Sequence, residues 1–131
     1  MWLMLGIAWA LAACGGRSQP ASQTSNEVQT LSVSGFEQAL AQGGVQLVDV
    51  RTAAEYAEGH LEGAVLIDVN SSSFLSDAQQ QLDPRRPVAL YCLRGKRSQK
   101  AAQQLADRGY EVLNLEGGIA AWRQAGKPVV P

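Results

Sequence analysis

The sequence predicts an α/β fold with an open, mainly parallel five-stranded sheet and helices on both faces. From about residue 30, short apolar runs alternate with stretches of helical periodicity, which is the pattern of repeated strand–helix units. The run "PVALYC" at 87–92 is almost continuously apolar, as expected of a central parallel strand that is covered on both sides. The chain has 131 residues, enough for one compact domain.

The first expected unit is a strand at 31–33 followed by a helix. Ser34 is placed to cap this helix, because Ser side chains accept hydrogen bonds from the free N–H groups of a first turn. Phe36 and Leu40 lie four residues apart and therefore share one helical face. The pair Gly43-Gly44 ends the helix.

The second unit is a strand at 45–50 followed by a short helix. Thr52 and Glu55 form a capping-box pair, in which each side chain bonds the other residue's backbone N–H. This pair predicts a helix over "AAEYAE" at 53–58, which Gly59 ends.

The third and fourth strands are expected at 63–69 and 87–92. Between them, "SSSFLSDAQQQL" at 71–82 predicts a helix that starts on a serine cap. Pro84 ends that region, because proline cannot continue a helix.

The last elements are two helices around a fifth strand. Alanine and leucine recur at helical spacing in "SQKAAQQLADRG" at 98–109, and Gly109 is its stop signal. A strand at 111–115 and a helix at 118–126 complete the pattern. Within these, Gly117-Gly118 is expected to form a turn and Trp122 a packing anchor.

The first fourteen residues, "MWLMLGIAWALAAC", carry no charge. A membrane-spanning helix needs about 20 apolar residues, so this segment is too short for one and resembles the hydrophobic part of an export signal. Its ending at 11–14 resembles a bacterial lipobox, which implies that Cys14 is acylated. A buried first helix is the alternative interpretation.

This resemblance divides the chain into a signal segment at 1–13, a Gly/Ser/Gln-rich flexible tether at 14–30 and a folded domain at 31–131. It also implies a location in the bacterial cell envelope, facing the periplasm and lipid-anchored to a membrane. Gly15 follows the cysteine in place of the aspartate associated with inner-membrane retention, which favours the outer membrane.

The chain has two cysteines, so acylation of Cys14 leaves Cys92 as the only thiol. In an oxidising compartment an unpaired thiol is either buried and inert or kept for chemistry. Cys92 follows the expected central strand and precedes a helix. In open α/β sheets, ligands bind at this place, where strands end and helices begin.

The sequence "CLRGKRS" at 92–98 has features that favour a thiolate. The free N–H groups of a helix amino end carry partial positive charge, and successive loop N–H groups converge on anions. Arg94, Lys96 and Arg97 add full charges, and Gly95 allows backbone conformations that other residues avoid. A nucleophilic Cys92 is therefore expected within an anion-binding loop of Leu93 to Arg97.

Three segments together resemble a single-domain rhodanese, a family of sulfurtransferases with an α/β fold: "DVRTAAEYAEGHLEGAVLID", "VALYCLRGKRSQKAAQQLADRGY" and "VLNLEGGIAAW". The resemblance covers roughly residues 30–130. It implies that Cys92 takes a sulfane sulfur from thiosulfate or a similar donor, becomes a persulfide and passes the sulfur to cyanide or a thiol. It implies that Leu93, Arg94, Gly95, Lys96 and Arg97 bind the donor, and that no metal or organic cofactor is needed.

Other functions remain open at this point. A dual-specificity phosphatase of the Cdc25 type, or a related arsenate reductase, has five residues between cysteine and arginine, whereas Ser98 stands at that position here. A non-catalytic persulfide carrier or binding module is the second alternative. The near-neutral net charge of −1 does not suggest a nucleic-acid partner.

Several residues near the expected site have a structural interpretation beside a functional one. Cys92 itself has the alternative of a small buried core residue. Asp49 and Arg51 are expected to brace the structure as an acid–arginine pair. His60, the only histidine, is expected to be structural because a thiolate mechanism needs no general base.

Overall fold

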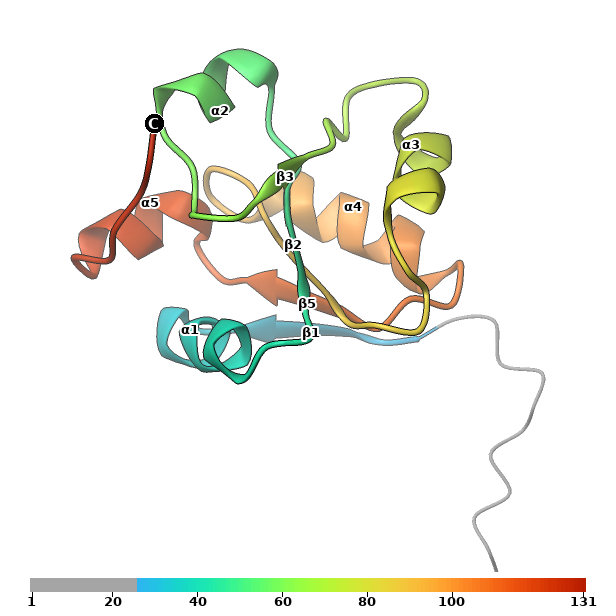
Figure 1. The fold of residues 1–131 in the computed structure, drawn as a ribbon, viewed down its shortest axis with the longest axis horizontal. Helices are drawn as coiled ribbons and strands as arrows, with labels where there is room; N and C mark the ends of the chain where they lie inside the picture. Colours follow the sequence, from blue (N-terminus) through green and yellow to red (C-terminus); the bar gives the residue numbers. More distant parts are fainter. Residues whose placement is uncertain (1–25) are drawn as a thin grey trace, which may run out of the picture.

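The computed structural model describes residues 26–131, which form a five-stranded parallel sheet in the order β1-β5-β4-β2-β3 (Figure 1). The strands are β1 (Val28–Leu31), β2 (Gln46–Asp49), β3 (Val65–Leu66), β4 (Val88–Tyr91) and β5 (Val112–Leu115). The predicted fold class is confirmed, and β4 is the central strand.

Five helices cover the sheet, and the direction of each crossover decides which face each helix takes. They are α1 (Val33–Gln42), α2 (Ala53–Glu58), α3 (Phe74–Gln81), α4 (Lys96–Ala106) and α5 (Gly118–Gln124). The connections through α1 and α2 run toward β3, whereas those through α3 and α4 run back toward β5. Because parallel crossovers are right-handed, opposite directions place these helix pairs on opposite faces.

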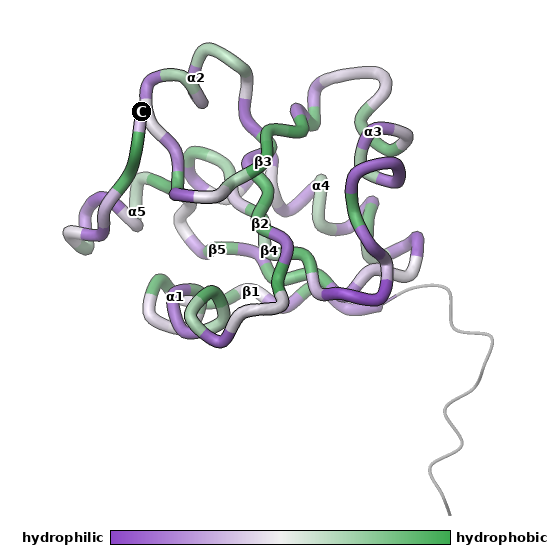
Figure 2. The backbone as a smooth tube through the Cα atoms, viewed as in Figure 1, coloured by the Kyte–Doolittle hydropathy of each residue, from purple (hydrophilic) through white to green (hydrophobic). Residues whose placement is uncertain are grey.

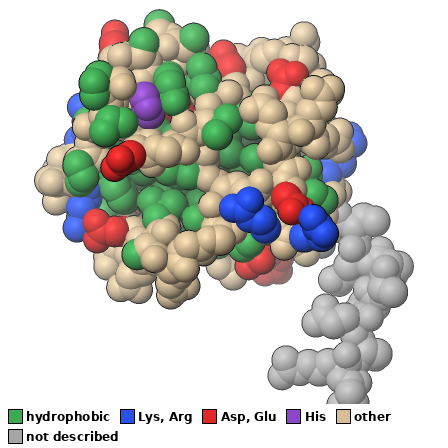
Figure 3. Space-filling model, in the orientation of Figure 1, with side chains coloured by type: hydrophobic (Ala, Val, Ile, Leu, Met, Phe, Trp, Pro, Cys, Tyr) green, Lys and Arg blue, Asp and Glu red, His purple; other side chains and the backbone are tan. Residues whose placement is uncertain are grey.

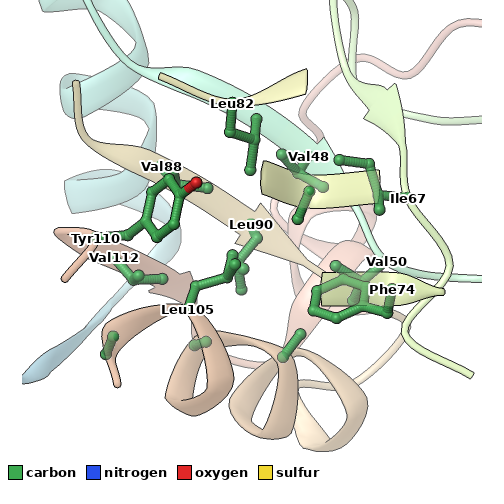
Figure 4. Packing of buried hydrophobic residues seen from close by; sticks show 14 of the residues in the cluster. Val48, Val50, Ile67, Phe74, Leu82, Val88, Leu90, Leu105, Tyr110 and Val112 are labelled. Atoms are coloured by element: carbon green, nitrogen blue, oxygen red, sulfur yellow. The ribbon is translucent and has the colours of Figure 1, made fainter. Parts of the chain in front are cut away.

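The core on the face of α3 and α4 consists of aliphatic residues from the central strands and small residues from α4. Leu90 and Val88 of β4 are fully buried, and they meet Leu105 of α4 and Phe74 of α3 (Figure 4). Figure 2 shows apolar stretches along the strands inside the molecule and an alternation of hydrophilic and hydrophobic residues along the helices around them. The continuous apolar character of β4 thus reflects packing on both of its faces.

The opposite face is covered by α1, α2 and α5. Phe36 of α1 meets Trp122 of α5 in an edge-to-face contact with ring centroids 6.4 Å apart. Trp122 also donates its indole N–H to the carbonyl of Pro128 at 2.9 Å, so it is the packing anchor that the sequence predicts. Figure 3 shows the hydrophobic side chains that gather on this face, with the single histidine near them.

The start of the domain differs from the prediction. The first strand is β1 at Val28–Leu31, not 31–33, so it includes residues that the sequence assigned to the tether. The cap of α1 is Ser32, whose side chain accepts from the N–H of Gly35 at 3.2 Å, and not Ser34. Val33 belongs to the helix instead of the strand because this cap starts the helix two residues earlier.

The predicted capping box of α2 is confirmed. The Thr52 side chain accepts from the backbone of Glu55, and the Glu55 carboxylate accepts from the backbone of Thr52. The next helix has a serine at its N-cap position, as predicted, but the expected capping bond is not made. Ser73 makes no capping bond, because its backbone, with φ −95° and ψ 12°, lacks the extended conformation of a capping residue; its hydroxyl donates to the Asp77 carboxylate at 2.8 Å.

The remaining strands are shorter than predicted, and α4 begins at Lys96, two residues before the predicted stretch, and ends at Ala106. The strand expected at 63–69 is regular only at 65–66, although the N–H groups of Ile67 and Val69 still bond the backbone of β2 and the residue after it.

Within residues 26–131, no helix is both long enough and apolar enough to cross a membrane.

Candidate active site

Cys92 lies directly after the central strand β4, at the edge of the sheet where all five strands end. The chain leaves β2 toward α2 on one face and leaves β4 toward α4 on the other. Such a divergence opens a crevice between neighbouring strands, and ligands bind there in open α/β sheets. Residues 92–95, here called the Cys92 loop, form this part of the edge (Figure 1).

The Cys92 sulfur is buried and accepts a hydrogen bond from the backbone N–H of Gly95 at 3.1 Å. Burial by itself raises the pKa of a thiol, because it disfavours the charged form. Hydrogen bonding from the hydroxyl and N–H of Ser98, and from the N–H groups of Gly95 and Arg94, outweighs burial and lowers the pKa of Cys92. The loop and the first turn of α4 together therefore stabilise a thiolate.

Ser98 was not predicted as a site residue, yet its side chain takes part in this stabilisation. It is fully buried, and its hydroxyl has no hydrogen-bond partner of good geometry among residues 26–131. It nevertheless stands close enough to the Cys92 sulfur to lower the thiol pKa. A signal was present in the sequence, because Ser98 lies three and four residues before the buried Ala101 and Ala102 and therefore shares their face.

The beginning of α5 orients the backbone of the Cys92 loop. The N–H groups of Ile119 and Ala120 donate to the carbonyls of Cys92 and Leu93 at 2.9 and 3.0 Å. These carbonyls are thus held toward α5, which leaves the next N–H groups of the loop free to face the sulfur.

Gly118 makes this close approach possible. A Cβ atom at this position would lie 2.4 Å from the carbonyl oxygens of both Cys92 and Leu93, and the residue has a φ of +62°. The predicted Gly117-Gly118 turn is present, but its contact with the Cys92 loop was not expected, because the two segments lie far apart in the sequence.

The three cations of the loop region have different surroundings. Arg97 makes two hydrogen bonds to the Glu55 carboxylate, at 2.7 and 2.8 Å. These bonds hold the pKa of Glu55 down at about 2. Arg94 and Lys96 are exposed and line a pocket of about 310 Å³ between the loop and the β1–β5 edge.

Leu93 lies on the other side of the loop and is 39% exposed. It borders a second pocket of about 520 Å³, here called the α2–α5 pocket. This pocket is lined by Arg51, Glu55, Glu58, Leu93, Ile119 and Arg123. The Cys92 loop thus separates a pocket lined by polar side chains, including two loop cations and Glu116, from one lined by charges of both signs and by apolar side chains.

Asp49 and Arg51 form the buried acid–arginine pair that the sequence predicts. Arg51 donates through Nε and Nη2 to the carboxylate, with a shortest distance of 2.7 Å, and also to the carbonyl of Gly59. The buried Tyr91 hydroxyl donates to the same carboxylate at 2.8 Å and accepts from the N–H of Leu61. This network ties β2 and β4 to the segment after α2.

His60 also occupies a structural position. Its ring stacks on Tyr56 with centroids 3.7 Å apart, and its Nδ1 lies 3.0 Å from the Tyr56 carbonyl. Its backbone pairs with Val130 through two hydrogen bonds of 2.8 Å, which fasten the C-terminal tail beside α2.

Two further expectations concern a metal and a lipid. The described residues contain no group of three His, Cys, Asp or Glu side chains that could hold a metal ion. Cys14 and the signal segment lie outside the described residues.

Comparison with known proteins agrees with this geometry. A family model described as "Rhodanese-like domain" matches residues 32–125. A protein named "Thiosulfate sulfurtransferase GlpE" from Shewanella oneidensis is 37% identical over 97 residues, which cover 72% of this chain and 92% of that protein. A "Sulfurtransferase" from Allochromatium vinosum is 39% identical over 87 residues, covering 66% and 78% of the two chains.

Solved structures show the same fold. The rhodanese-like domain of an Anabaena protein superposes with a TM-score of 0.70 at 26% identity, covering 80% of each chain. A rhodanese-related protein from Thermoplasma volcanium gives a TM-score of 0.69 at 25% identity, covering 78% of this chain and 97% of that one. With a matching family model over most of its length and relatives above 30% identity, the chain belongs to the rhodanese-like domain family.

Proposed function

We propose that this protein is a sulfurtransferase that moves a sulfane sulfur from thiosulfate, or a similar donor, through a persulfide on Cys92. The observation that carries the proposal is the lowered pKa of a buried thiol that sits inside a ring of hydrogen-bond donors. Relatives named as sulfurtransferases support the same reaction class.

The first half of the reaction loads the enzyme. The Cys92 thiolate attacks the outer sulfur of thiosulfate, a bond forms between the two sulfur atoms, and sulfite leaves with the electron pair of the broken bond. Arg94 and Lys96 attract the dianionic donor through their uncompensated charges. The N–H groups of Arg94 and Gly95 then stabilise the negative charge of the persulfide, as preorganised dipoles do in an oxyanion hole.

The second half returns the enzyme to its starting state. Cyanide or an acceptor thiolate attacks the outer sulfur of the persulfide, and Cys92 leaves as a thiolate. The donors that lower the pKa of Cys92 also make it a better leaving group, since a less basic thiolate leaves faster. One set of contacts thus serves both half-reactions.

Two contacts favour sulfur over phosphate as the group bound by the loop. The sixth position after Cys92 holds the buried Ser98, so no arginine stands there to clamp a tetrahedral anion. Arg97, one position earlier, is already paired with Glu55. Phosphatase or arsenate reductase chemistry would need that guanidinium for the substrate.

The test is sulfite release from thiosulfate by the purified protein, with cyanide or a thiol as acceptor. Wild-type protein is expected to turn over, while a Cys92→Ser variant with an unchanged circular dichroism spectrum is expected to release no sulfite. Turnover by the folded Cys92→Ser variant would overturn the proposal. Loading of Cys92 without turnover on any acceptor would instead make the protein a persulfide carrier.

We further propose that the protein is a bacterial envelope lipoprotein, acylated on Cys14 and anchored on the periplasmic side of a membrane. This proposal depends on the resemblance of residues 11–14 to a lipobox. Several acyl chains would anchor the chain stably, since one chain holds weakly. Intact mass of membrane-extracted protein is expected to show loss of residues 1–13 and added acyl mass; an unmodified full-length chain in the cytoplasm would contradict it.

A further inference from the structure

The α2–α5 pocket lies beside the Cys92 loop, on the face of the sheet that α2 and α5 share (Figure 1). Its apolar wall comes from Leu93, which directly follows the nucleophile, and from Ile119, whose N–H holds the Cys92 carbonyl. A molecule bound there would therefore contact the loop that holds the sulfur on its Leu93 side, and the first turn of α5 beside it.

Two of the four charges in this pocket are already compensated. Arg51 is paired with Asp49, and Glu55 is paired with Arg97. The other two charges, Glu58 and Arg123, are exposed, and neither forms an ion pair with any side chain in residues 26–131. The pocket thus offers one free carboxylate and one free guanidinium.

These two free charges lie close to each other without pairing. Arg123 comes from the last turn of α5 and Glu58 from the last turn of α2. The Nη2 atom of Arg123 lies over Gly59, the residue after Glu58, where it would be 2.6 Å from a Cβ atom. The guanidinium is thus packed against the backbone beside Glu58, and both side chains are left with unused hydrogen-bonding capacity toward the pocket.

We propose that this pocket receives the sulfur acceptor, and that the acceptor is a thiol of amino-acid size that carries both an ammonium and a carboxylate group. Arg123 binds its carboxylate, Glu58 binds its ammonium, and Leu93 contacts its methylene carbons. A zwitterion satisfies both free charges at once, whereas an anion or a cation leaves one of them unpaired. This proposal rests on the proposed sulfurtransferase function, whose persulfide is the sulfur source.

The transfer step needs only the acceptor thiol and the Cys92 persulfide. The acceptor thiol first loses its proton to solvent. Its thiolate then forms a bond to the outer sulfur of the Cys92 persulfide while the bond between that sulfur and Sγ breaks. The electron pair of the broken bond returns to Sγ as the Cys92 thiolate, and the outer sulfur leaves as the persulfide of the acceptor.

The experiment compares four small thiols that carry both charged groups, the ammonium alone, the carboxylate alone or neither: cysteine, cysteamine, 3-mercaptopropionate and 2-mercaptoethanol. The donor is saturating thiosulfate, and kcat/KM is expressed per thiolate and divided by the rate constant of the same thiolate with a small-molecule disulfide, which corrects for differences in nucleophilicity. We expect cysteine to have the highest value and 2-mercaptoethanol the lowest. Equal values for all four would overturn the proposal.

Two variants assign the two charges separately. Arg123→Gln is expected to raise KM about three- to ten-fold for cysteine and 3-mercaptopropionate but not for cysteamine. Glu58→Gln is expected to raise KM for cysteine and cysteamine but not for 3-mercaptopropionate. Matched controls are Arg85→Gln and Glu62→Gln, exposed charges outside this pocket. A uniform change across all four acceptors, or none, would contradict the assignment.

Cyanide as acceptor separates this proposal from the proposed function. Cyanide carries neither recognition group, so both variants should keep wild-type turnover with it. Turnover with cyanide but no discrimination among the thiols would overturn the acceptor pocket alone. Absence of any sulfur on Cys92 after thiosulfate treatment would overturn the proposed function and the acceptor pocket together.

Discussion

Among the individual side chains, Ser98 and Cys92 show most directly how the pKa of a thiol is lowered without a paired base. Burial opposes the thiolate, while the Ser98 hydroxyl and the nearby N–H groups favour it. All these groups lie within six positions of the cysteine, so they are placed by the turn between β4 and α4. The histidine, in contrast, stacks on Tyr56 and serves the C-terminal tail.

Replacement of Ser98 by alanine tests the effect of its hydroxyl on Cys92. Ser98→Ala is expected to raise the pKa of Cys92, because it removes a donor to the thiolate. Alkylation by iodoacetamide at neutral pH should slow about five-fold, the effect of one hydrogen bond of about 1 kcal/mol. The full pH–rate profile should move toward higher pH. Ser76→Ala on the exposed part of α3 is the matched control, and identical profiles for the two variants would contradict this role.

The helices act on the site mainly through their first turns. The amino end of α4 supplies donors to the sulfur, and that of α5 holds the loop carbonyls away from it. The capping box of α2 contributes through the same Glu55 carboxylate that pairs with Arg97, so it joins α2 to α4.

The Glu55–Arg97 pair that joins α2 to α4 is expected to stabilise the fold less as the pH falls. Since Arg97 lowers the pKa of Glu55 from 4.5 to about 2, the pair stabilises the fold fully above 4.5 and loses its effect as the pH falls through about 2. Glu55→Gln should therefore cost about 1–2 kcal/mol near neutral pH, less at pH 4 and almost nothing near pH 2. Urea unfolding at several pH values measures this, with the exposed Glu62→Gln as control. A pH-independent difference would count against the link.

The contact between α5 and the Cys92 loop is tested by comparing two substitutions, Gly118→Ala and Gly126→Ala. Gly118→Ala would push a Cβ against two loop carbonyls, and a displacement of about 1 Å at a reacting group costs roughly 100-fold in rate. Gly126 also has a positive φ, of +76°, but nothing lies near it. Gly126→Ala should cost about 1 kcal/mol of stability and keep its activity. Equal sulfite release by the two folded variants would show that α5 does not position the loop.

Local signals predicted local structure well. The capping box at Thr52 and Glu55 identified α2, and the apolar run at 87–92 identified the central strand. At Ser32 and Ser34 the sequence offers two caps two residues apart, and only packing of Val33 and Phe36 against the sheet selects the earlier one. The contact of Gly118 with the Cys92 loop was not predictable, because it depends on where α5 lies relative to β4.

For the molecule as a whole, the order β1-β5-β4-β2-β3 places Cys92 at the end of the central strand β4. There the connections that leave the neighbouring strands β2 and β4 diverge onto opposite faces, through α2 and α4. Helix α4 contributes both to the site and to the core, but through different turns. Ser98 lies in its first turn, near Cys92, whereas Leu105 lies seven residues later, in its last turn.

Substitutions of Leu105 in the core should therefore change the free energy of unfolding without changing the reactivity of Cys92. Leu105→Ala removes a fully buried side chain and should lower the free energy of unfolding by about 2–5 kcal/mol. Leu105→Met keeps the volume and should cost less than about 1.5 kcal/mol. Both variants should keep the wild-type pH profile for alkylation of Cys92 under conditions where they are folded; a shifted profile in either would show that the core and the site are coupled.

The formation of a persulfide on Cys92 is tested most directly by peptide-level mass spectrometry of wild-type protein after exposure to thiosulfate. We expect the peptide that contains Cys92 to gain the mass of one sulfur atom and to lose it again on addition of cyanide. A peptide that stays unmodified, in folded protein whose Cys92 still reacts with iodoacetamide, would contradict the proposed sulfur transfer.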